Sequence, residues 1–249
     1  MTERQTRILE MVNEHQKVEV NTLSEVLGVS QVTIRKDLDS LEELGLLTRE
    51  HGYAVIKNSA DIGNRLAIRY DTKYKLAKAA ARLVSDGETV MIESGSSCAL
   101  LAEILARDKK EVTIITNSAF IARHIRESSA GRIILLGGEY QKEAEVMVGP
   151  LVRTCAREFY VDKFFMGTDG FITEAGFTCG DMMRAEAMKN MAESARRTMI
   201  LTDSSKFSQQ GVVLQPRFEE IDTVFTDSNI PSGIKEILEQ HHIKVEITQ

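Results

Sequence analysis

The groups best suited to binding chemistry in this 249-residue chain are hydroxyls, glycines and charges that follow short apolar runs. The first such cluster is Glu93–Ser97, which reads Glu-Ser-Gly-Ser-Ser. A glycine there lets backbone N–H groups approach an anion, the serine hydroxyls add donors, and a following helix N-terminus favours negative charge. The cluster is typical of a phosphate-binding loop, and a simple capped helix start is the alternative interpretation.

Four more apolar runs end in small polar residues. Asp169 can accept hydrogen bonds from sugar hydroxyls, and Lys206 can pair with phosphate or hydroxyl oxygens. In an open α/β sheet the carboxyl ends of the strands meet at one edge, where ligands bind. Loops are generally rich in such residues, but we predict that they form one ligand site. Its predicted residues are Ser94, Gly95, Ser96, Ser97, Asn117, Gly137, Gly138, Asp169, Gly170 and Lys206.

A second cluster lies near the N-terminus, where the segment Val20–Leu41 fits a helix-turn-helix. Gly28 suits the turn, and Ser30 is a suitable N-cap for the second helix. The exposed first turn of that helix offers side chains that can bind base edges and phosphates. The predicted DNA contacts, including two from a following hairpin, are Ser30, Gln31, Thr33, Arg35, Lys36, Arg49 and His51. A helical interaction module that never binds DNA is the alternative.

Net charge does not by itself indicate a nucleic-acid-binding protein. The whole chain carries a formal charge of −6, and the first 57 residues contain seven lysines and arginines against ten acids. Binding to DNA therefore has to depend on cations placed locally, because no strongly basic domain is present.

The elements that position these clusters fall into two groups. Residues 1–57 predict a winged helix-turn-helix domain with three helices, over Arg4–His15, from an N-cap at Asn21 to Leu27, and over Gln31–Leu44. A hairpin over residues 46–56 follows, and residues 58–71 are interpreted as a linker. From residue 72 to 249, helical stretches alternate with β-rich runs, which predicts a Rossmann-like α/β domain. The runs are Thr89–Ile92, Val112–Ile115, Ile133–Leu136, Lys163–Met166, Thr198–Leu201, Thr223–Phe225 and Lys244–Ile247.

Other features indicate a soluble cytoplasmic protein. The first residues lack the apolar core of a secretion signal, and the longest apolar runs have the length of strands, so no membrane association is expected. The odd number of cysteines, with no paired spacing, fits reduced thiols better than disulfides or zinc ligands. His241-His242 has no acid or cysteine at metal-binding spacing, so no metal site is predicted.

Several strings resemble the DNA-binding domain of the DeoR family of transcription regulators, whose pattern includes Ser-x-x-Thr-Ile-Arg-(Arg/Lys)-Asp-Leu. They are Arg4–Leu9, Leu27–Ser30, Thr33–Leu38 and Leu46–Gly52. Members usually read His-Gly-Gly-Ala after the wing turn, whereas this chain has Tyr53 in place of the second glycine. Their sensor domain usually reads Asp-Ser-Gly-Thr-Thr where this chain has Glu93–Ser97. That loop resembles the phosphate loop of ribose-5-phosphate isomerases.

The resemblance covers about residues 3–228. Phe165–Gly170 and Asp203–Phe207 match the sensor pattern, and Gly-Thr-Asp-Gly is similar to the glucitol-type repressors. It implies a homo-oligomeric repressor of a sugar-metabolism operon that binds double-stranded operator DNA and a phosphorylated sugar effector, without a cofactor or catalytic residues. The effector could release the protein from DNA or strengthen its binding.

Two alternatives to a ligand-controlled regulator remain at this point. The first is a sugar-phosphate isomerase-like enzyme that retains activity, but the isomerase pattern Asp-Gly-Ala-Asp-Glu is replaced here by Asp169–Thr173, which reads Asp-Gly-Phe-Ile-Thr. Two acids of that pattern are therefore missing, although Glu174 or Glu186 could substitute. The second alternative is an oligomerisation scaffold that binds no ligand.

Overall fold

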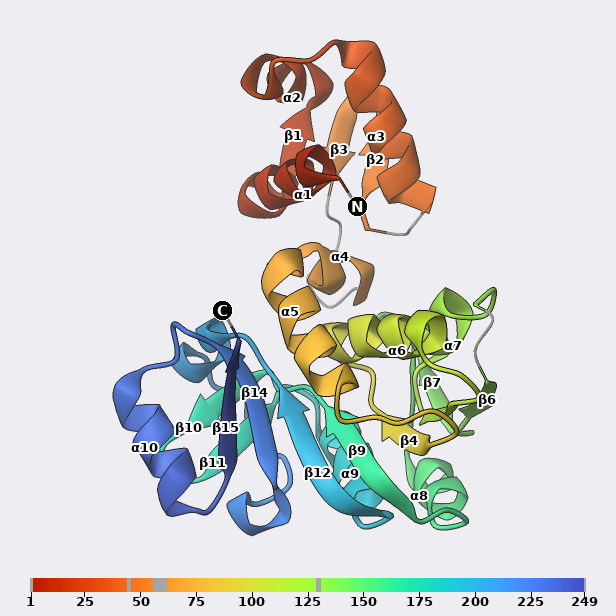
Figure 1. The fold of residues 1–249 in the computed structure, drawn as a ribbon. Coiled ribbons are helices and arrows are strands. Elements are labelled where there is room, and N and C mark those ends of the chain that lie inside the picture. The colour runs from red at the N-terminus through yellow and green to blue at the C-terminus, as the bar shows by residue number, and fades with distance from the viewer. Residues whose placement is uncertain (1, 44–45, 56–61, 129–130, 249) are drawn as a thin grey trace. The chain divides into compact units, whose positions relative to one another are not determined.

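The computed structural model describes residues 2–43, 46–55, 62–128 and 131–248. The chain forms two compact units, Met1–Tyr70 and Asp71–Gln249, which are treated separately below (Figure 1). Within the described residues, no helix combines the length and the apolar character that a membrane span requires.

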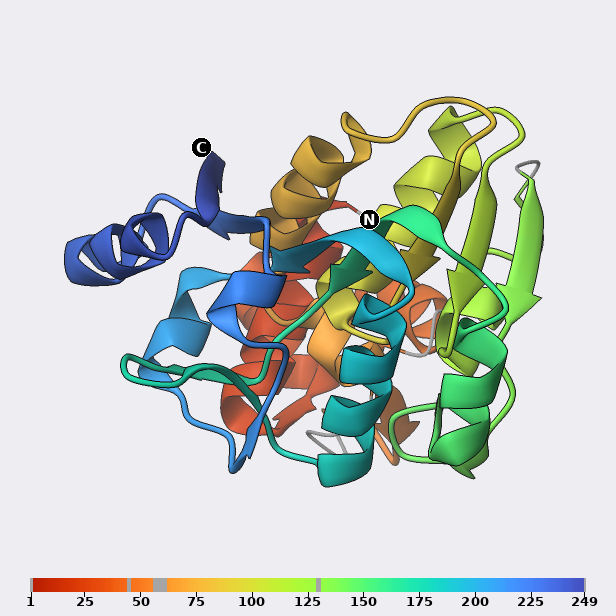
Figure 2. The same ribbon diagram turned by 90° about the horizontal axis from the view of Figure 1, so that it is seen from below.

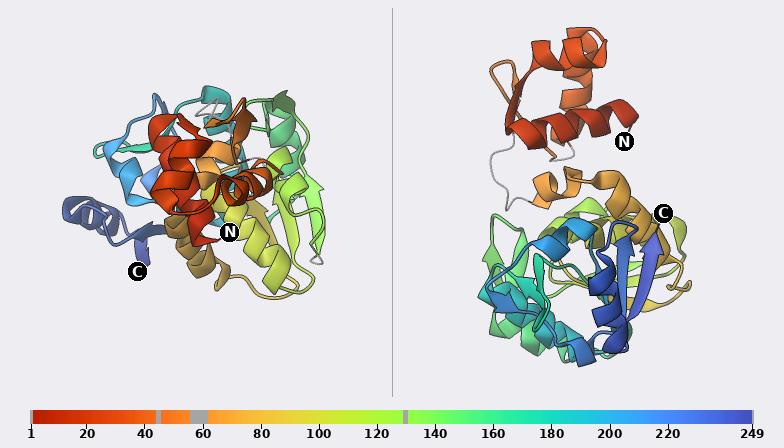
Figure 3. Two further views of the ribbon diagram at one scale, coloured as in Figure 1. Left: turned by 90° about the horizontal axis from the view of Figure 1, so that it is seen from above. Right: turned by 90° about the vertical axis from the view of Figure 1, so that its left-hand side faces the viewer.

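The described residues of the first unit form four helices and a small antiparallel sheet in the order β1-β3-β2. In both views of Figure 3, the helices between residues 3 and 43, drawn in red to dark orange, lie together. The helices are α1 (Glu3–His15), α2 (Val20–Leu27), α3 (Gln31–Glu43) and α4 (Ile62–Ala67). The strands are β1 (Lys17–Glu19), β2 (Thr48–Glu50) and β3 (Tyr53–Val55). The winged helix-turn-helix predicted from the sequence is therefore present.

The start of α2 differs from the prediction. The N-cap position is Glu19, which makes no side-chain capping bond, and not Asn21. Strand β1 runs directly into the helix, and the Val20 N–H donates to the Gly52 carbonyl at 2.9 Å. The wing turn therefore satisfies the first N–H group of the helix in place of a solvent contact.

The start of α3 confirms the prediction for Ser30, whose Oγ accepts the Thr33 N–H at 3.2 Å. The predicted stripe of Ile34, Leu38 and Leu41 is completely buried. The predicted end of this helix at Leu44 and Gly45 lies outside the described residues.

Part of the segment 58–71 that was interpreted as a linker is helical. Helix α4 lies within it, with Ile62 and Leu66 buried, and it contacts α1. Two apolar residues four positions apart are too weak a pattern to predict a helix this short. The preceding residues 56–61, which include the end of the predicted hairpin, lie outside the described residues.

The second unit is built on a seven-stranded parallel sheet in the order β15-β14-β12-β9-β4-β5-β6. Each of the seven predicted runs forms one of its strands, which confirms the predicted α/β fold class. The strands are β4 (Thr89–Ile92), β5 (Thr113–Thr116), β6 (Arg132–Leu135), β9 (Val161–Met166), β12 (Ala195–Leu201), β14 (Thr223–Asp227) and β15 (Lys244–Thr248).

Helices cover both faces of this sheet (Figures 1 and 2). They are α5 (Tyr70–Ala81), α6 (Ser96–Asp108), α7 (Ala119–His124), α8 (Pro150–Ala156), α9 (Met182–Ala192) and α10 (Ser232–Gln240). Helix α9 contacts β9 and β12, and α7 contacts β5 and β6. The core on the α8–α9–α10 side is formed by aliphatic, methionine and phenylalanine side chains such as Phe164, Met188 and Leu238.

Two smaller antiparallel sheets and two 3-10 turns were not predicted. One sheet has the order β10-β11-β13, and the other pairs β7 with β8. Their bounds are β7 (Glu139–Gln141), β8 (Val146–Val148), β10 (Gly170–Ile172), β11 (Gly176–Cys179) and β13 (Val213–Leu214). The turns are η1 (Ser204–Ser208) and η2 (Phe218–Glu220).

Strand order reverses between β4 and β9. From β4 the chain adds β5 and then β6 toward one edge, whereas from β9 it adds β12, β14 and β15 toward the other. In open α/β sheets, ligands bind outside the carboxyl ends of the strands at such a reversal. The loops after β4 and β9 are therefore the first place to look for a ligand site.

Candidate DNA interface and ligand site

The start of α3 has one exposed side, opposite the buried Ile34. Gln31, Arg35 and Lys36 are exposed, and Thr33 is half-buried. The Arg35 guanidinium donates to the Gln31 side chain one turn earlier, at 3.4 Å from Nη2 to Oε1. Four of the predicted DNA contacts, Gln31, Thr33, Arg35 and Lys36, therefore lie together at the start of α3, and Ser30 is its cap.

An ion pair fixes α3 against α1. Asp37 is only 7% exposed. The Arg4 guanidinium binds both of its carboxylate oxygens, at 2.5 Å from Nε to Oδ2 and 3.2 Å from Nη2 to Oδ1. Bidentate pairs of this kind fix geometry as well as adding energy. A recognition helix has to be held rigidly with its first turn exposed, and this contact contributes to that arrangement.

The wing is fastened to β1 on one side and to α3 on the other. His51 and Gly52 form its two-residue turn, with φ values of 43° and 89°, and two such left-handed residues are typical of a tight hairpin turn. The Lys17 ammonium lies 4.4 Å from the centre of the Tyr53 ring. Arg49 pairs with Asp39, and its N–H donates to Glu42 Oε1 at 2.8 Å. Arg49, predicted as a DNA contact, therefore also joins the wing to α3.

In the second unit, the loops after β4 and β9 touch at the reversal of strand order. A Cβ atom on Gly95 would lie 3.2 Å from the Cα of Gly167, so a side chain at Gly95 would force the two loops apart. The loop is also covered, because Ser94, Ser96 and Ser97 are each no more than 6% exposed. The predicted phosphate loop thus has the expected position, but its hydroxyls are turned inward.

The carboxylate of Glu93 occupies the donors of this loop. Its Oε2 accepts the Gly95 N–H at 2.8 Å and the Gly167 N–H at 3.4 Å, and its Oε1 accepts the Ser94 hydroxyl at 2.5 Å. Glu93 is itself 2% exposed. The loop therefore behaves as an anion-binding nest whose present anion is a side chain of the same chain.

Asp169, after β9, forms a second polar group with α9. Its Oδ2 accepts the Gly180 N–H at 3.0 Å and lies 3.3 Å from Nη2 of Arg184. Burial lowers the pKa of Arg184, but Asp169, Cys179 and Glu93 outweigh it and raise that pKa above its ordinary value. Burial also raises the pKa of the Cys179 thiol to about 12, so this cysteine is not a thiolate nucleophile.

Close backbone packing explains why two of the predicted ligand residues, Gly138 and Gly170, are glycines. A Cβ atom on Gly138 would lie 2.6 Å from the Val148 carbonyl oxygen, and one on Gly170 would lie 2.4 Å from that of Gln209. These glycines are needed for close backbone approach. Gly137, after β6, has only the Cys155 sulfur within reach, at 3.8 Å.

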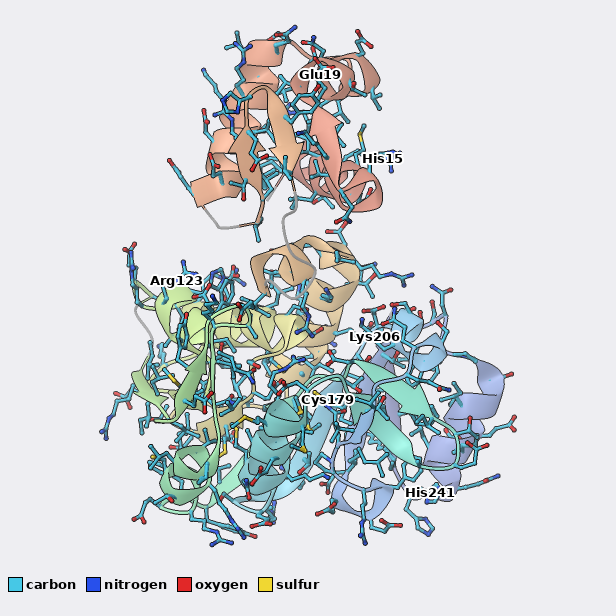
Figure 4. All side chains as sticks on the ribbon, turned by 180° about the vertical axis from the view of Figure 1, so that it is seen from behind. His15, Glu19, Arg123, Cys179, Lys206 and His241 are labelled. Atoms are coloured by element: carbon cyan, nitrogen blue, oxygen red, sulfur yellow. The ribbon has the colours of Figure 1, made fainter. Side chains whose placement is uncertain are left out.

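Lys206 lies on the turn η1 after β12. Asp203 Oδ1 accepts the Ser205 N–H at 3.1 Å, and Asp227 Oδ2 accepts the Ser204 N–H at 2.7 Å. These two carboxylates hold the turn, and the Lys206 ammonium donates to Gln209 Oε1 at 2.8 Å. Figure 4 labels Lys206 and Cys179 in this part of the second unit.

Sequence reasoning missed three polar residues at this edge. Glu93 was noted only as a departure from a pattern, Arg184 lies within an unremarkable helix, and Gln215 follows a two-residue strand. Gln215 Nε2 donates to the Gly167 carbonyl at 3.0 Å. Within the described residues its Oε1 has no hydrogen-bond donor, and neither has the Oδ1 of Asn117, whose Nδ2 donates to the Met147 carbonyl at 3.0 Å. Both buried oxygens are suited to accept from a hydroxyl-rich ligand.

A groove lies at the opposite edge of the sheet, away from the loops after β4 and β9. Its volume is about 620 Å³, and its lining includes Tyr160, Phe218 and His241, whose ring is stacked on Phe218 with 4.1 Å between centroids. None of the predicted ligand residues lines it. In the part of the chain that the structure describes, no group of three or more His, Cys, Asp or Glu side chains is arranged to hold a metal ion.

Comparison with known proteins gives matches over both units. The DeoR-like helix-turn-helix domain matches residues 4–60, and the DeoR C terminal sensor domain matches residues 68–228. The putative aga operon transcriptional repressor of Escherichia coli O157:H7 is 28% identical, covering 98% of this chain and 93% of that protein. The glycerol-3-phosphate regulon repressor of Escherichia coli K12 is also 28% identical, covering 99% of this chain and 98% of that protein.

Among solved structures, ribose 5 phosphate isomerase A from Neisseria gonorrhoeae is similar with a TM-score of 0.40 and 16% identity. The match covers 54% of this chain and 52% of the enzyme, so the chain spans about half the length of that protein. A likeness at this level supports no statement about activity.

Proposed function

The chain belongs to the DeoR family, and on that premise we propose that it represses a sugar-metabolism operon under the control of a phosphorylated sugar. It is a transcription regulator with a helix-turn-helix domain rather than an enzyme, as the curated relatives that it matches over nearly their whole length are named repressors. The operator, the effector class and the oligomeric state are the parts that we propose.

The observation that carries the DNA-binding proposal is the exposed first turn of α3. Gln31, Thr33 and Arg35 offer an amide, a hydroxyl and a guanidinium on a helix fixed by the Arg4–Asp37 pair. These groups match the donor and acceptor patterns of adenine and guanine in the major groove. The wing residues Arg49 and His51 lie beside this helix in the same unit and are proposed to contact the backbone of the duplex.

Replacing Arg35 tests this assignment. We expect Arg35→Ala to weaken binding to duplexes selected from a random DNA library by about tenfold or more, as is usual for a base-reading arginine. Ligand binding by the second unit should be unchanged. Equal DNA affinity of wild type and variant would remove α3 from the interface.

The phosphosugar proposal rests on the carboxyl edge of the sheet. The loop after β4 opens the 13-residue helix α6, whose N-cap is Gly95 and therefore has no side chain to satisfy the first amides. Amides at a helix N-terminus favour phosphate, and the unpaired oxygens of Asn117 and Gln215 suit sugar hydroxyls. A phosphate that binds here would take over donors from Glu93. One relative, by its name, represses a glycerol-3-phosphate regulon, whose substrate is a phosphorylated polyol.

A panel of sugars and polyols, each with and without phosphate, tests the effector class by thermal melting of the full chain. A ligand at about a hundred times its dissociation constant stabilises the bound protein by about 2.7 kcal/mol. We expect a shift with one phosphorylated compound and none with its parent sugar. Lys206→Ala should reduce that shift while operator binding stays intact. An unphosphorylated sugar that shifts the melt equally would overturn the phosphate assignment.

In the proposed mechanism, the effector shifts the protein between a conformational state that binds the operator and one that does not. A homodimer or larger assembly places two copies of α3 on a palindromic or repeated operator. The effector controls DNA affinity only to the extent that it binds one conformational state better than the other. Repression relieved by a pathway intermediate follows if the ligand-bound state is the one that does not fit the operator.

A further inference from the structure

Val32 is an apolar residue on the most exposed part of α3. It is 61% exposed, between Gln31 and Thr33 in the first turn of the helix. The remaining apolar residues of this helix, Ile34, Leu38 and Leu41, are completely buried. Val32 therefore contributes little packing that would explain an isopropyl group at this position.

Val32 lies on the side of α3 that is opposite to the packed side. At about 100° per residue, Val32 lies roughly 160° around the axis from Ile34, the first residue of the buried stripe. Lys36, one turn later on the same outward side, is also exposed. In a helix that enters a groove with its packed side facing its own domain, the residue opposite the stripe meets the floor of the groove.

We propose that the Val32 side chain reads a thymine, by contact with its C5-methyl group in the major groove. The inference rests on the proposed operator binding by α3. Most other groups that the bases present in that groove are hydrogen-bond donors or acceptors, which an aliphatic side chain would desolvate without replacing their hydrogen bonds. The thymine methyl is the largest apolar group there, and cytosine presents only a C5–H at the same place, so burial against Val32 favours thymine. Val32 thereby sets sequence preference beside the polar contacts of Gln31, Thr33 and Arg35.

Helix α2 provides a matched control. Val26 is 59% exposed, nearly the same as Val32, but it lies on the helix that precedes the turn at Gly28. Single exposed apolar residues are common on protein surfaces. Exposure alone therefore does not distinguish a residue that contacts a base from one that has no role in DNA binding. If neither valine contacted DNA, Val26→Ala and Val32→Ala would bind the selected duplexes equally well.

The experiment uses the full chain and duplexes that it selects from a random DNA library at fixed salt. Each thymine of the selected duplex is replaced singly by deoxyuridine, which removes only the C5-methyl group. For wild type and Val26→Ala we expect one thymine per half-site whose replacement weakens binding by about fourfold, the value of one buried methyl group. Val32→Ala should bind the unmodified duplex correspondingly more weakly and show no loss at that position.

Two results would overturn the inference. Either no thymine replacement weakens wild-type binding, or Val32→Ala retains the same sensitivity as wild type at every position. The proposed function fails in a different way, because then no duplex is enriched or Arg35→Ala binds as well as wild type. Melting temperatures of both alanine variants equal to that of the wild type verify that neither substitution unfolds the domain, as expected for exposed side chains.

Discussion

The carboxylate of Glu93 accepts the backbone N–H of Gly95, two residues farther along the chain, with 2.8 Å between Oε2 and N. The same oxygen accepts the N–H of Gly167 from the neighbouring strand end. These N–H groups are those that a glycine-containing loop offers to a bound anion. The chain therefore supplies an internal anion at its own candidate phosphate site, and a bound phosphate competes with Glu93.

Removing the charge of Glu93 should strengthen phosphate binding. Glu93→Gln keeps the size of the side chain and an acceptor oxygen, but it takes a negative charge away from the place where a phosphate would bind. Two like charges about 4 Å apart repel by about 1 kcal/mol even in water, so we expect affinity to rise at least about fivefold. The affinity is measured by calorimetric titration, with the phosphorylated compound that shifts the melting temperature as the ligand.

Glu103→Gln is the matched control, because Glu103 also lies near this region of the sequence, on α6, but pairs with His124 at 2.9 Å. It removes the same charge away from the loop and should leave phosphate affinity unchanged. Unchanged or weaker binding by Glu93→Gln would mean that the carboxylate supports the loop without competing for its donors.

The Glu93–Ser97 loop also illustrates what sequence can and cannot predict. Its place after a buried strand was predictable, because alternation of apolar runs and helical stretches determined all seven strands of the main sheet. The bonds from Glu93 to Gly167 join residues that are far apart in sequence, so no local pattern indicates them. The β10-β11-β13 sheet was missed for a related reason, since strands of two to four residues carry almost no periodicity.

Replacing Arg184 should destabilise the second unit. Its guanidinium faces Asp169, and its side chain is only 16% exposed. Arg184→Met fills a similar volume but removes the guanidinium that lies 3.3 Å from the Asp169 carboxylate, which should cost about 1–3 kcal/mol. Urea denaturation of the full chain measures the change, with Arg153→Met on the exposed side of α8 as the control, where less than about 0.5 kcal/mol is expected. Equal losses of stability in the two variants would mean that the Arg184–Asp169 pair does not stabilise the second unit.

Gly170 and Gly233 should respond in opposite ways to a methyl group. At Gly170 a Cβ atom would lie 2.4 Å from the Gln209 carbonyl oxygen, and at Gly233 it would meet nothing within 4 Å. Gly170→Ala should therefore cost about 1–3 kcal/mol through overpacking, whereas Gly233→Ala, in α10, should be neutral or slightly stabilising. Thermal melting of both variants measures the changes in stability. A Gly170→Ala variant as stable as wild type would show that the segments around Gly170 and Gln209 separate easily.

Asp227 should make the stability of the second unit depend on pH. Burial raises the pKa of its carboxyl, but hydrogen bonds from the N–H groups of Ser204 and Asn229 outweigh burial and hold that pKa below the ordinary value of 3.8. The unfolded chain then takes up its proton at a higher pH than the folded chain does. The stabilisation is therefore fully present above about pH 4 and is lost as the pH falls through the lowered pKa.

Asp227→Asn keeps the shape and an acceptor oxygen but removes the charge that strengthens these two bonds. At pH 7 we expect the variant to be less stable by about 1 kcal/mol, the usual advantage of a charged acceptor over a neutral one. The difference should narrow as the pH is lowered from 5 toward 3, because wild-type Asp227 becomes protonated and then resembles the variant. Urea denaturation of both proteins at a series of pH values measures it. A difference that stays constant with pH would mean that the shape of the side chain, and not its charge, holds the turn that carries Lys206.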